Sequence, residues 1–117
     1  VIVGGLSGVH QWVRIGRGAM IGAVTMVTAD VIPYGLVQGP RGHLDGLNLI
    51  GLKRKGYGKD QLRRLLSAYR FLFEGEGEFA GRLAEIEGRY GDMEEIKEII
   101  EFIRAGGKRP LCLPNAE

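Results

Sequence analysis

Residues 1–28, VIVGGLSGVHQWVRIGRGAMIGAVTMVT, carry an aliphatic side chain at every sixth position, and several of these are followed by glycine. The aliphatic positions are Val3, Val9, Ile15, Ile21 and Val27, and the glycines are Gly4, Gly16 and Gly22. Helices repeat about every 3.6 residues and strands about every 2, so a period of six fits neither one long helix nor one long strand. A chain that turns a corner every six residues has this period, with the aliphatic side chain inside and glycine allowing a tight turn where a Cβ would clash. The stretch therefore predicts a parallel β-solenoid, rather than glycine-rich strands of an ordinary sheet.

The composition of the 117 residues fits one domain with an appendage. A hydrophobic content of 44% is sufficient for a packed core, and the 20 glycines are well above average usage. The net charge of +2 is too small to indicate a nucleic-acid-binding protein. Between Arg41 and Arg70, however, eight basic residues are accompanied only by Asp45 and Asp60. This local excess predicts an anionic ligand or partner near the middle of the chain.

Cysteine usage and hydropathy bear on the compartment. The single cysteine, Cys112, excludes an internal disulfide and is compatible with a reducing environment. No apolar run is long enough to span a membrane, and no signal peptide is visible. We therefore expect a cytoplasmic protein that is not transmembrane.

Fewer than two coils of three hexads fit before Pro33, whereas a solenoid needs about three repeats and a capped end. We therefore interpret the chain as the C-terminal part of a longer protein.

The pattern changes after the repeat. Pro33 and Gly35 end the six-residue register, a last strand at Leu36 and Val37 is possible, and residues 41–45 look like a loop. From Gly46 the periodicity is helical. We expect four helices, over Leu47–Lys55, from Lys59 through Phe73, over Glu78–Tyr90, and over Asp92–Ala105 with Asp92 as its cap. The tail should be extended against the body or frayed. The predicted domains are residues 1–40, solenoid coils, and residues 41–117, a small helical bundle and tail that packs on the solenoid end or on a neighbouring subunit.

Several segments resemble a known family. GGLSGVHQWVRIG (4–16), GAMIGAVTMVTADVIPYGLVQG (18–39) and GLNLIGLKRKGYG (46–58) closely resemble the C-terminal part of the acyl-carrier-protein–UDP-N-acetylglucosamine O-acyltransferases, and SAYRFLFEGEG and RPLCLP are similar too. The resemblance covers nearly the whole chain, and its most specific part is the segment after the solenoid. It implies a left-handed parallel β-helix, a homotrimer with active sites between subunits, and the first step of lipid A biosynthesis. In that step a 3-hydroxyacyl chain passes from acyl carrier protein, which holds it on phosphopantetheine, to the 3-hydroxyl of UDP-N-acetylglucosamine. No further cofactor and no metal are implied.

Acyl transfer to a sugar hydroxyl needs a base for the hydroxyl proton and donors for the oxyanion. The resemblance places the family's general-base histidine on an earlier coil, upstream of Val1, so we expect no catalytic residue in this chain and no turnover by it alone. His10 and Gln11 match a His-Gln pair that contacts the nucleotide sugar, and a polar pair in an aliphatic repeat is costly unless it is satisfied. The alternative for His10 is a subunit-interface histidine bonded to a backbone carbonyl. His43 matches no motif, and we interpret it as a surface histidine in a loop.

The resemblance assigns nucleotide-sugar and phosphate contacts to Asn48, Arg54 and Lys55. An asparagine amide both donates and accepts, and a guanidinium pairs bidentately with phosphate. Lys55 stands where many relatives have a second arginine, so the charge is kept but the fork geometry is lost. Ile50 stands where some relatives have a carboxylate, so one sugar hydrogen bond is missing. The alternative for this segment is a solvated cationic helix end.

Two further groups of residues are assigned by the resemblance. Met20 and Ala23 match positions that line the acyl groove, where a glycine leaves room for a longer chain, so Ala23 predicts an acyl chain of intermediate length. A basic surface for the acidic carrier protein is expected from Lys53, Lys59, Arg63, Arg64 and Arg70, and such contacts weaken with salt.

Other functions remain open from the sequence. Another hexapeptide-repeat acyltransferase of the same pathway, such as the N-acyltransferase, would share the solenoid, but GLNLIGLKR argues against it. A carbonic anhydrase on this repeat needs three zinc histidines, and only His10 lies in a repeat. A non-catalytic trimerisation module is the third alternative.

Overall fold

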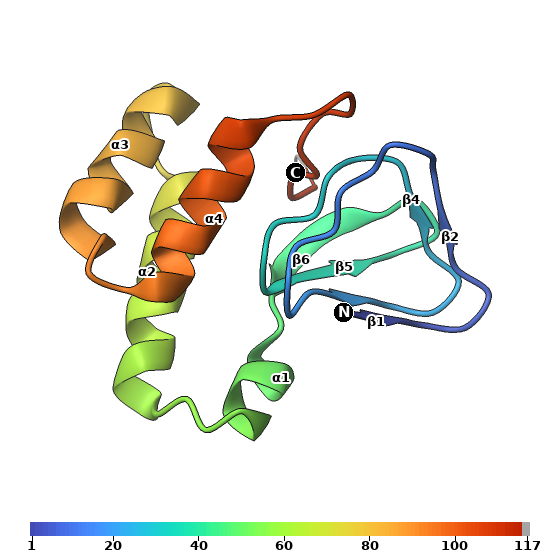
Figure 1. The fold of residues 1–117 in the computed structure, drawn as a ribbon, viewed down its shortest axis with the longest axis horizontal. Helices are drawn as coiled ribbons and strands as arrows, with labels where there is room; N and C mark the ends of the chain where they lie inside the picture. The colour runs from blue at the N-terminus through green and yellow to red at the C-terminus, as the bar shows by residue number, and fades with distance from the viewer. Residues whose placement is uncertain (116–117) are drawn as a thin grey trace.

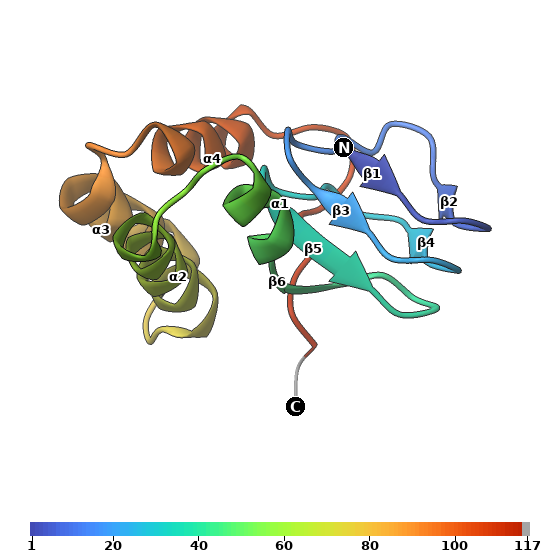
Figure 2. The same ribbon diagram turned by 90° about the horizontal axis from the view of Figure 1, so that it is seen from below.

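The computed structural model describes residues 1–115, with short strands wound into coils on one side and helices on the other (Figure 1). The strands form two sheets. The larger contains β1 (Ile2–Val3), β3 (Met20–Ile21), β5 (Gly35–Gln38) and β6 (His43–Leu47), in that order, and the smaller contains β2 (Gly8–Val9) and β4 (Met26–Val27). Figure 2 shows β1, β3 and β5 stacked one above the other. The predicted combination of a β-solenoid with helices is therefore present.

Strand register confirms the length expected for a coil. Ile2 lies opposite Met20 in a parallel pair and Gly8 lies opposite Met26, so one coil takes 18 residues, or three hexads. The next coil is shorter, because Met20 lies opposite Leu36, 16 residues further on. The aliphatic register points inward as predicted where a neighbouring coil covers it, and Ile21 and Val27 are buried.

The corners differ from the expectation that glycine makes the turns. Positive φ recurs every six residues, at Leu6, Trp12, Gly18 and Val24, and only one of these is glycine. The glycines after the aliphatic positions serve close approach instead. A Cβ on Gly4 would lie 2.5 Å from the backbone nitrogen of Ala23 on the next coil. Glycine therefore allows neighbouring coils to stack, while larger residues take the left-handed corner conformation.

The segment after the last parallel strand is a strand, so the prediction of a loop over residues 41–45 was wrong. In β6, Leu44 and Leu47 are buried while Asp45 is exposed. The strand pairs antiparallel with β5, and the Leu44 N–H also donates to the Leu113 carbonyl at 2.9 Å. Strand β6 therefore pairs with β5 across residue 40, where the sequence predicts the solenoid domain to end. The polar and glycine residues of this segment occupy the less buried positions of an edge strand.

Four helices follow, close to their predicted bounds: α1 (Leu49–Arg54), α2 (Lys59–Glu74), α3 (Phe79–Tyr90) and α4 (Glu94–Ala105). Leu47 belongs to β6, and Asn48 caps α1. The prediction that Asp92 caps α4 was wrong, because Met93 is the N-cap and the Asp92 carboxylate forms an ion pair with Arg64 on α2. None of the helices among residues 1–115 has the length and apolar character of a membrane span.

The coils and helices share one hydrophobic core. Ile32, from the turn before β5, is 1% exposed and lies among apolar side chains of the helices that include Leu72, Ile86, Ile96 and Ile99. The helical part therefore packs on the solenoid, as its small number of apolar residues predicts.

The chain after α4, residues 106–113, runs back over the coils (Figure 1), and we call it the strap. It is extended and fixed by backbone hydrogen bonds. The Asp30 N–H donates to the Pro110 carbonyl, and the Cys112 N–H donates to the Asp30 carbonyl, both at 2.8 Å. The tail is thus extended against the body, one of the two states that the sequence allows.

Below the strap lies an ion pair between a buried aspartate and an arginine whose side chain is 30% exposed. The Asp30 side chain is 2% exposed, and one carboxylate oxygen lies 2.8 Å from an Arg14 guanidinium nitrogen. The other accepts from the Arg14 backbone N–H at 2.9 Å. The guanidinium also donates to the Phe102 carbonyl on α4 at 3.0 Å and lies over the Phe102 ring. Arg14 and Asp30 therefore join two successive coils, the strap and α4.

Candidate functional site

A groove of about 650 Å³ lies where β6, α1 and α2 meet. It brings together Met20, Asn48 and Arg70, which the sequence assigns to an acyl groove, a sugar contact and a carrier-protein surface. His43 also lines it, half-buried on β6 rather than on a surface loop. The rest of the wall mixes leucines with polar side chains, including Leu36, Leu44, Leu66, Asp45, Glu74 and Tyr69. An apolar floor with a few polar groups is typical of a ligand site.

Tyr69 lines both this groove and the apolar interface between the coils and the helices. Burial, with the neighbouring Glu74 carboxylate, raises the pKa of Tyr69 to about 12. The hydroxyl is therefore protonated at neutral pH and available as a hydrogen-bond donor.

Asn48 joins the solenoid to α1. Its side chain accepts from the Gly51 N–H at 3.1 Å, which caps the helix, and donates to the Gly18 carbonyl at 3.1 Å. Its backbone N–H donates to the Tyr34 carbonyl at 2.7 Å. The residue is 7% exposed. One amide hydrogen and one lone pair are not used by these bonds, so the amide keeps capacity toward a ligand while it positions α1.

Three cations, Lys53, Arg54 and Lys55, are exposed at the C-terminal end of α1, where the helix dipole favours positive charge. Among residues 1–115, none of the three side chains forms an ion pair or a hydrogen bond within the chain. Lys55 lies with Asn48 on the wall of a small cavity of about 170 Å³. Lys53 and Arg54 are thus left without such partners among the described residues, whereas Lys55 also lines a cavity that contains Glu95 and Glu98 and helps to lower the pKa of Glu98.

The other predicted substrate residues lie elsewhere in the chain. His10 and Gln11 are exposed at the end of β2, on the outer coil, and do not line the groove that contains Asn48. Ala23 is exposed beside Gly4 and is also absent from the wall that contains Met20. One copy of the chain therefore does not bring the two halves of the predicted site into one cleft.

The expected docking residues fall into two groups. Lys59 and Arg63 are exposed on α2. Arg64 instead places two guanidinium nitrogens 2.8 Å from the two Asp92 carboxylate oxygens and lies over the Tyr90 ring. Its side chain is thus used to hold α2 to the segment before α4, which the sequence pattern does not reveal.

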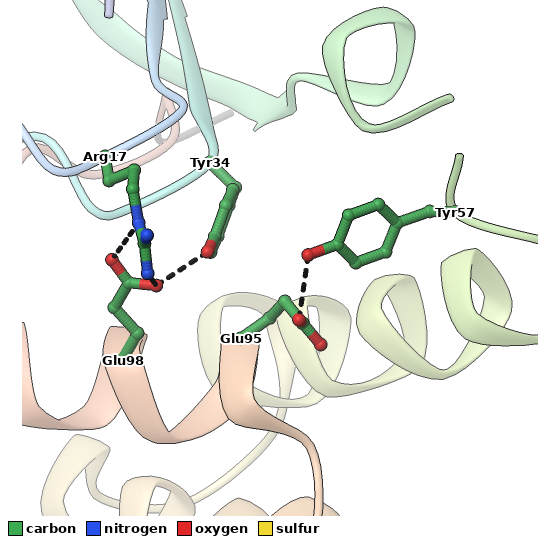
Figure 3. Close-up of polar contacts among 5 residues, drawn as sticks. All are labelled: Arg17, Tyr34, Tyr57, Glu95 and Glu98. Atoms are coloured by element: carbon green, nitrogen blue, oxygen red, sulfur yellow. Dashed lines mark hydrogen bonds and ion pairs between the residues drawn. The ribbon is translucent and has the colours of Figure 1, made fainter. Parts of the chain in front are cut away.

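A polar network that sequence reasoning missed joins the coils to α4 (Figure 3). The Arg17 guanidinium donates twice to the Glu98 carboxylate, at 2.9 and 3.1 Å, and the Tyr34 hydroxyl donates to the same carboxylate at 2.6 Å. Nearby, the Tyr57 hydroxyl donates to Glu95 at 2.8 Å. Glu98 is 64 residues from Tyr34 and 81 residues from Arg17 in the chain, so no local sequence pattern predicts these hydrogen bonds.

The network shifts the pKa of each partner. Burial, followed by the hydrogen bond to Glu98, raises the pKa of the Tyr34 hydroxyl. Burial would raise the pKa of Glu98, but the hydrogen bonds from Arg17 and Tyr34 outweigh it and hold this pKa below its usual range. The network is therefore strongest with Glu98 ionised and Tyr34 protonated.

We expect acid to weaken this attachment. A carboxylate with a lowered pKa in the folded state stabilises the protein above its unfolded pKa and loses that contribution as the pH falls through the folded value. The free energy of unfolding, measured by urea titration, should therefore fall below about pH 4.3, the usual value for glutamate. The Glu98→Gln variant should be less stable than the parent at pH 7 and show a smaller loss at low pH. Identical pH profiles for both proteins would contradict this role of Glu98.

No group of three or more histidine, cysteine, aspartate or glutamate side chains suited to a metal ion occurs within residues 1–115.

Comparison with known proteins decides the family. The model of a protein family described as UDP-N-acetylglucosamine O-acyltransferase, domain 2, matches residues 30–112, which include the four helices, the Asn48 cap and all of the strap except Leu113. The chain belongs to this family of acyltransferases. Relatives in the family agree over a longer stretch. The acyl-[acyl-carrier-protein]–UDP-N-acetylglucosamine O-acyltransferase of Paracoccus denitrificans is 58% identical over 98% of this chain and 43% of its own length. That of Caulobacter vibrioides is 48% identical over 78% of this chain and 35% of its own.

Solved structures of family members have the same arrangement of coils and helices. The UDP-N-acetylglucosamine acyltransferase of Arabidopsis superposes with a TM-score of 0.87 at 34% identity, over 94% of this chain and 41% of that one. The enzyme of Campylobacter jejuni gives 0.84 at 31% identity, over 97% and 43%. The chain thus spans less than half the length of these members of the acyltransferase family.

Proposed function

We propose that this chain takes part in transferring a 3-hydroxyacyl group from acyl carrier protein to the 3-hydroxyl of UDP-N-acetylglucosamine, the first step of lipid A biosynthesis, in the cytoplasm. The observation that carries the proposal is the 58% identity, over 98% of the chain, to a Paracoccus protein named for this activity. Lys55, which shares a small cavity with the Asn48 amide, and the exposed Arg54 before it support the proposal, because a nucleotide sugar presents a diphosphate and hydroxyl groups.

In this proposal, Asn48, Arg54 and Lys55 bind the nucleotide sugar from the end of α1, and His10 and Gln11 bind it from the outer coil of a neighbouring copy. Arg54, Lys55, His10 and Gln11 are all exposed, which supports such a shared site, while Asn48 is buried at the base of α1. The coils would then be left-handed, as in the family, and the chain would assemble as a homotrimer. Residues 1–117 supply positioning and recognition, and the general-base histidine lies outside them.

The acidic carrier protein would dock on the basic surface formed by Lys53, Lys59, Arg63 and Arg70. Arg64 would contribute little to this surface, because its charge is largely neutralised by Asp92. The acyl donor arrives on the carrier's own phosphopantetheine, so no other cofactor is needed. Such a contact should weaken as salt is added.

The proposal can be tested in a chimera, in which this chain replaces the aligned segment of the Paracoccus relative. We expect the chimera to convert UDP-N-acetylglucosamine and a 3-hydroxyacyl carrier protein to the 3-O-acyl ester, identified by mass spectrometry. The relative without its aligned segment, and this chain alone, should form no ester. A chimera that is folded by circular dichroism but forms no ester would contradict the proposal.

Acyl-chain preference provides a separate prediction. Ala23→Gly in the chimera removes one methyl group from the proposed acyl groove and should shift kcat/KM toward longer acyl donors. One methylene in an apolar pocket discriminates about tenfold or somewhat more. Competition between donors that differ by two carbons measures the shift. An unchanged donor preference would remove Ala23 from the groove.

A further inference from the structure

We propose that Arg109, assisted by Lys108, positions the His10–Gln11 turn for binding of the nucleotide sugar. Both cations lie on the strap, at the opposite end of the chain from the turn. The inference rests on the proposed function, and it adds a role for the strap that the resemblance does not assign.

The contacts join the strap to the two residues beside His10. The Arg109 guanidinium donates to the Gln11 carbonyl through Nε at 3.1 Å. The Lys108 ammonium lies 3.6 Å from the centroid of the Trp12 ring. A charged donor on a carbonyl and a cation over an indole face each contribute more than an ordinary surface contact. Two successive strap residues thus hold two successive residues of the turn.

The turn needs such support. Trp12 has a φ of +69°, in the left-handed region that a bulky residue adopts only at a cost, and its side chain is 58% exposed. The turn is anchored at its start, where the His10 N–H donates to the Val27 carbonyl at 2.9 Å, but within it the Val13 N–H reaches the His10 carbonyl only at 3.4 Å. The exposed indole and Gln11 carbonyl are therefore fixed from outside the coil, by the strap.

The strap backbone is itself held in place, so its side chains can position the turn. Its backbone pairs with Asp30 on both sides of Leu111, and Asp30 is buried. The Arg109 side chain therefore extends from a fixed backbone toward Gln11, while His10 and Gln11 keep their own side chains free for a ligand. Loss of the Arg109 contact should loosen the turn and weaken sugar binding, with little effect on the chemical step.

The first arm of the test uses the chain itself and does not depend on its function. Trp12 is the single tryptophan, so its fluorescence reports the turn directly. We expect Arg109→Ala and Lys108→Ala to shift its emission to the red and to increase quenching by acrylamide. Arg41→Ala, a control at an exposed arginine, should leave both unchanged. Unaltered Trp12 emission and quenching in both strap variants would overturn the proposed attachment.

The second arm measures steady-state kinetics in the chimera. Arg109→Ala should raise the KM for UDP-N-acetylglucosamine about tenfold, the equivalent of one hydrogen bond from a charged group, and leave kcat within twofold. Arg109→Lys should restore most of the affinity, since an ammonium can also donate to the carbonyl. A KM within twofold of the parent chimera, or a fall in kcat alone, would overturn the positioning role. An inactive parent chimera would instead count against the proposed function, leaving the fluorescence result to decide whether the strap holds the turn.

Discussion

Replacing Asp30 by asparagine should lower the free energy of unfolding by about 1–3 kcal/mol, the cost of losing a hydrogen bond to a charged group, because the carboxylate is buried while the Arg14 side chain is 30% exposed and can be hydrated. Asp30 is 2% exposed at its side chain, and its carboxylate accepts from both the guanidinium and the backbone N–H of Arg14. An asparagine of the same shape keeps one acceptor but leaves the guanidinium charge uncompensated. Since Arg14 also reaches α4, the substitution should loosen the coils and helices together.

Urea unfolding at pH 7 measures this effect. Asp45→Asn is the matched control, because Asp45 is exposed and its carboxylate forms one hydrogen bond, with Gln38 at 3.2 Å. We expect the control to change stability by less than about 1 kcal/mol, as for other exposed polar contacts. An Asp30→Asn protein within about 1 kcal/mol of the parent would show that the ion pair does not hold the strap and coils together.

A single methyl group at Gly16 should cost about 3 kcal/mol or more, the upper range for overpacking a tight contact. A Cβ on Gly16 would lie 2.3 Å from the backbone nitrogen of Pro33 and 2.6 Å from its Cα. Backbone cannot rotate away as a flexible side chain can, so the two coils would have to separate. The substitution tests coil stacking rather than turn formation, because Gly16 is not among the positive-φ residues.

Gly5→Ala is the control for this effect. Gly5 lies in the same repeat, yet a Cβ there would meet no atom within 4 Å. We expect Gly5→Ala to change stability by no more than about 1 kcal/mol, within the range of an alanine that fits the glycine conformation. Equal urea midpoints for Gly16→Ala and Gly5→Ala would contradict the stacking role of Gly16.

The periodic features of the chain could be predicted from its sequence. The period of six gives the 18-residue coil seen between Ile2 and Met20, and the apolar stripe places α2 from Lys59. The period does not show whether a given glycine forms a turn or allows two coils to approach closely. Gly4 and Gly16 looked like turn residues because glycine is common in turns, but the turns fall on Leu6, Trp12 and Val24. The close approach of two coils depends on residues of both coils, so the sequence of one repeat does not reveal it.

Features that depend on partners far apart in the chain were missed. The prediction of a loop over residues 41–45 fails because the first residues of β6 are held in a strand by β5 and by the strap. Asp92 was assigned to a cap, a local role, and instead binds Arg64. The resemblance assigned Asn48 and Arg54 to the candidate site, and of these Asn48 lines the groove whereas Arg54 is exposed at the end of α1. The strap contact at Gln11 joins residues 98 apart, so local pattern gives no sign of it.

Recognition of a nucleotide sugar by the cationic end of α1 can be tested by the affinity of the chimera for UDP-N-acetylglucosamine, measured by isothermal titration calorimetry. Arg54→Ala should weaken binding about tenfold to a hundredfold, as expected for a charge-assisted contact to phosphate, and Arg54→Lys should weaken it less. The control Arg41→Ala should bind like the parent. Equal affinity of the parent and Arg54→Ala proteins would contradict the claim.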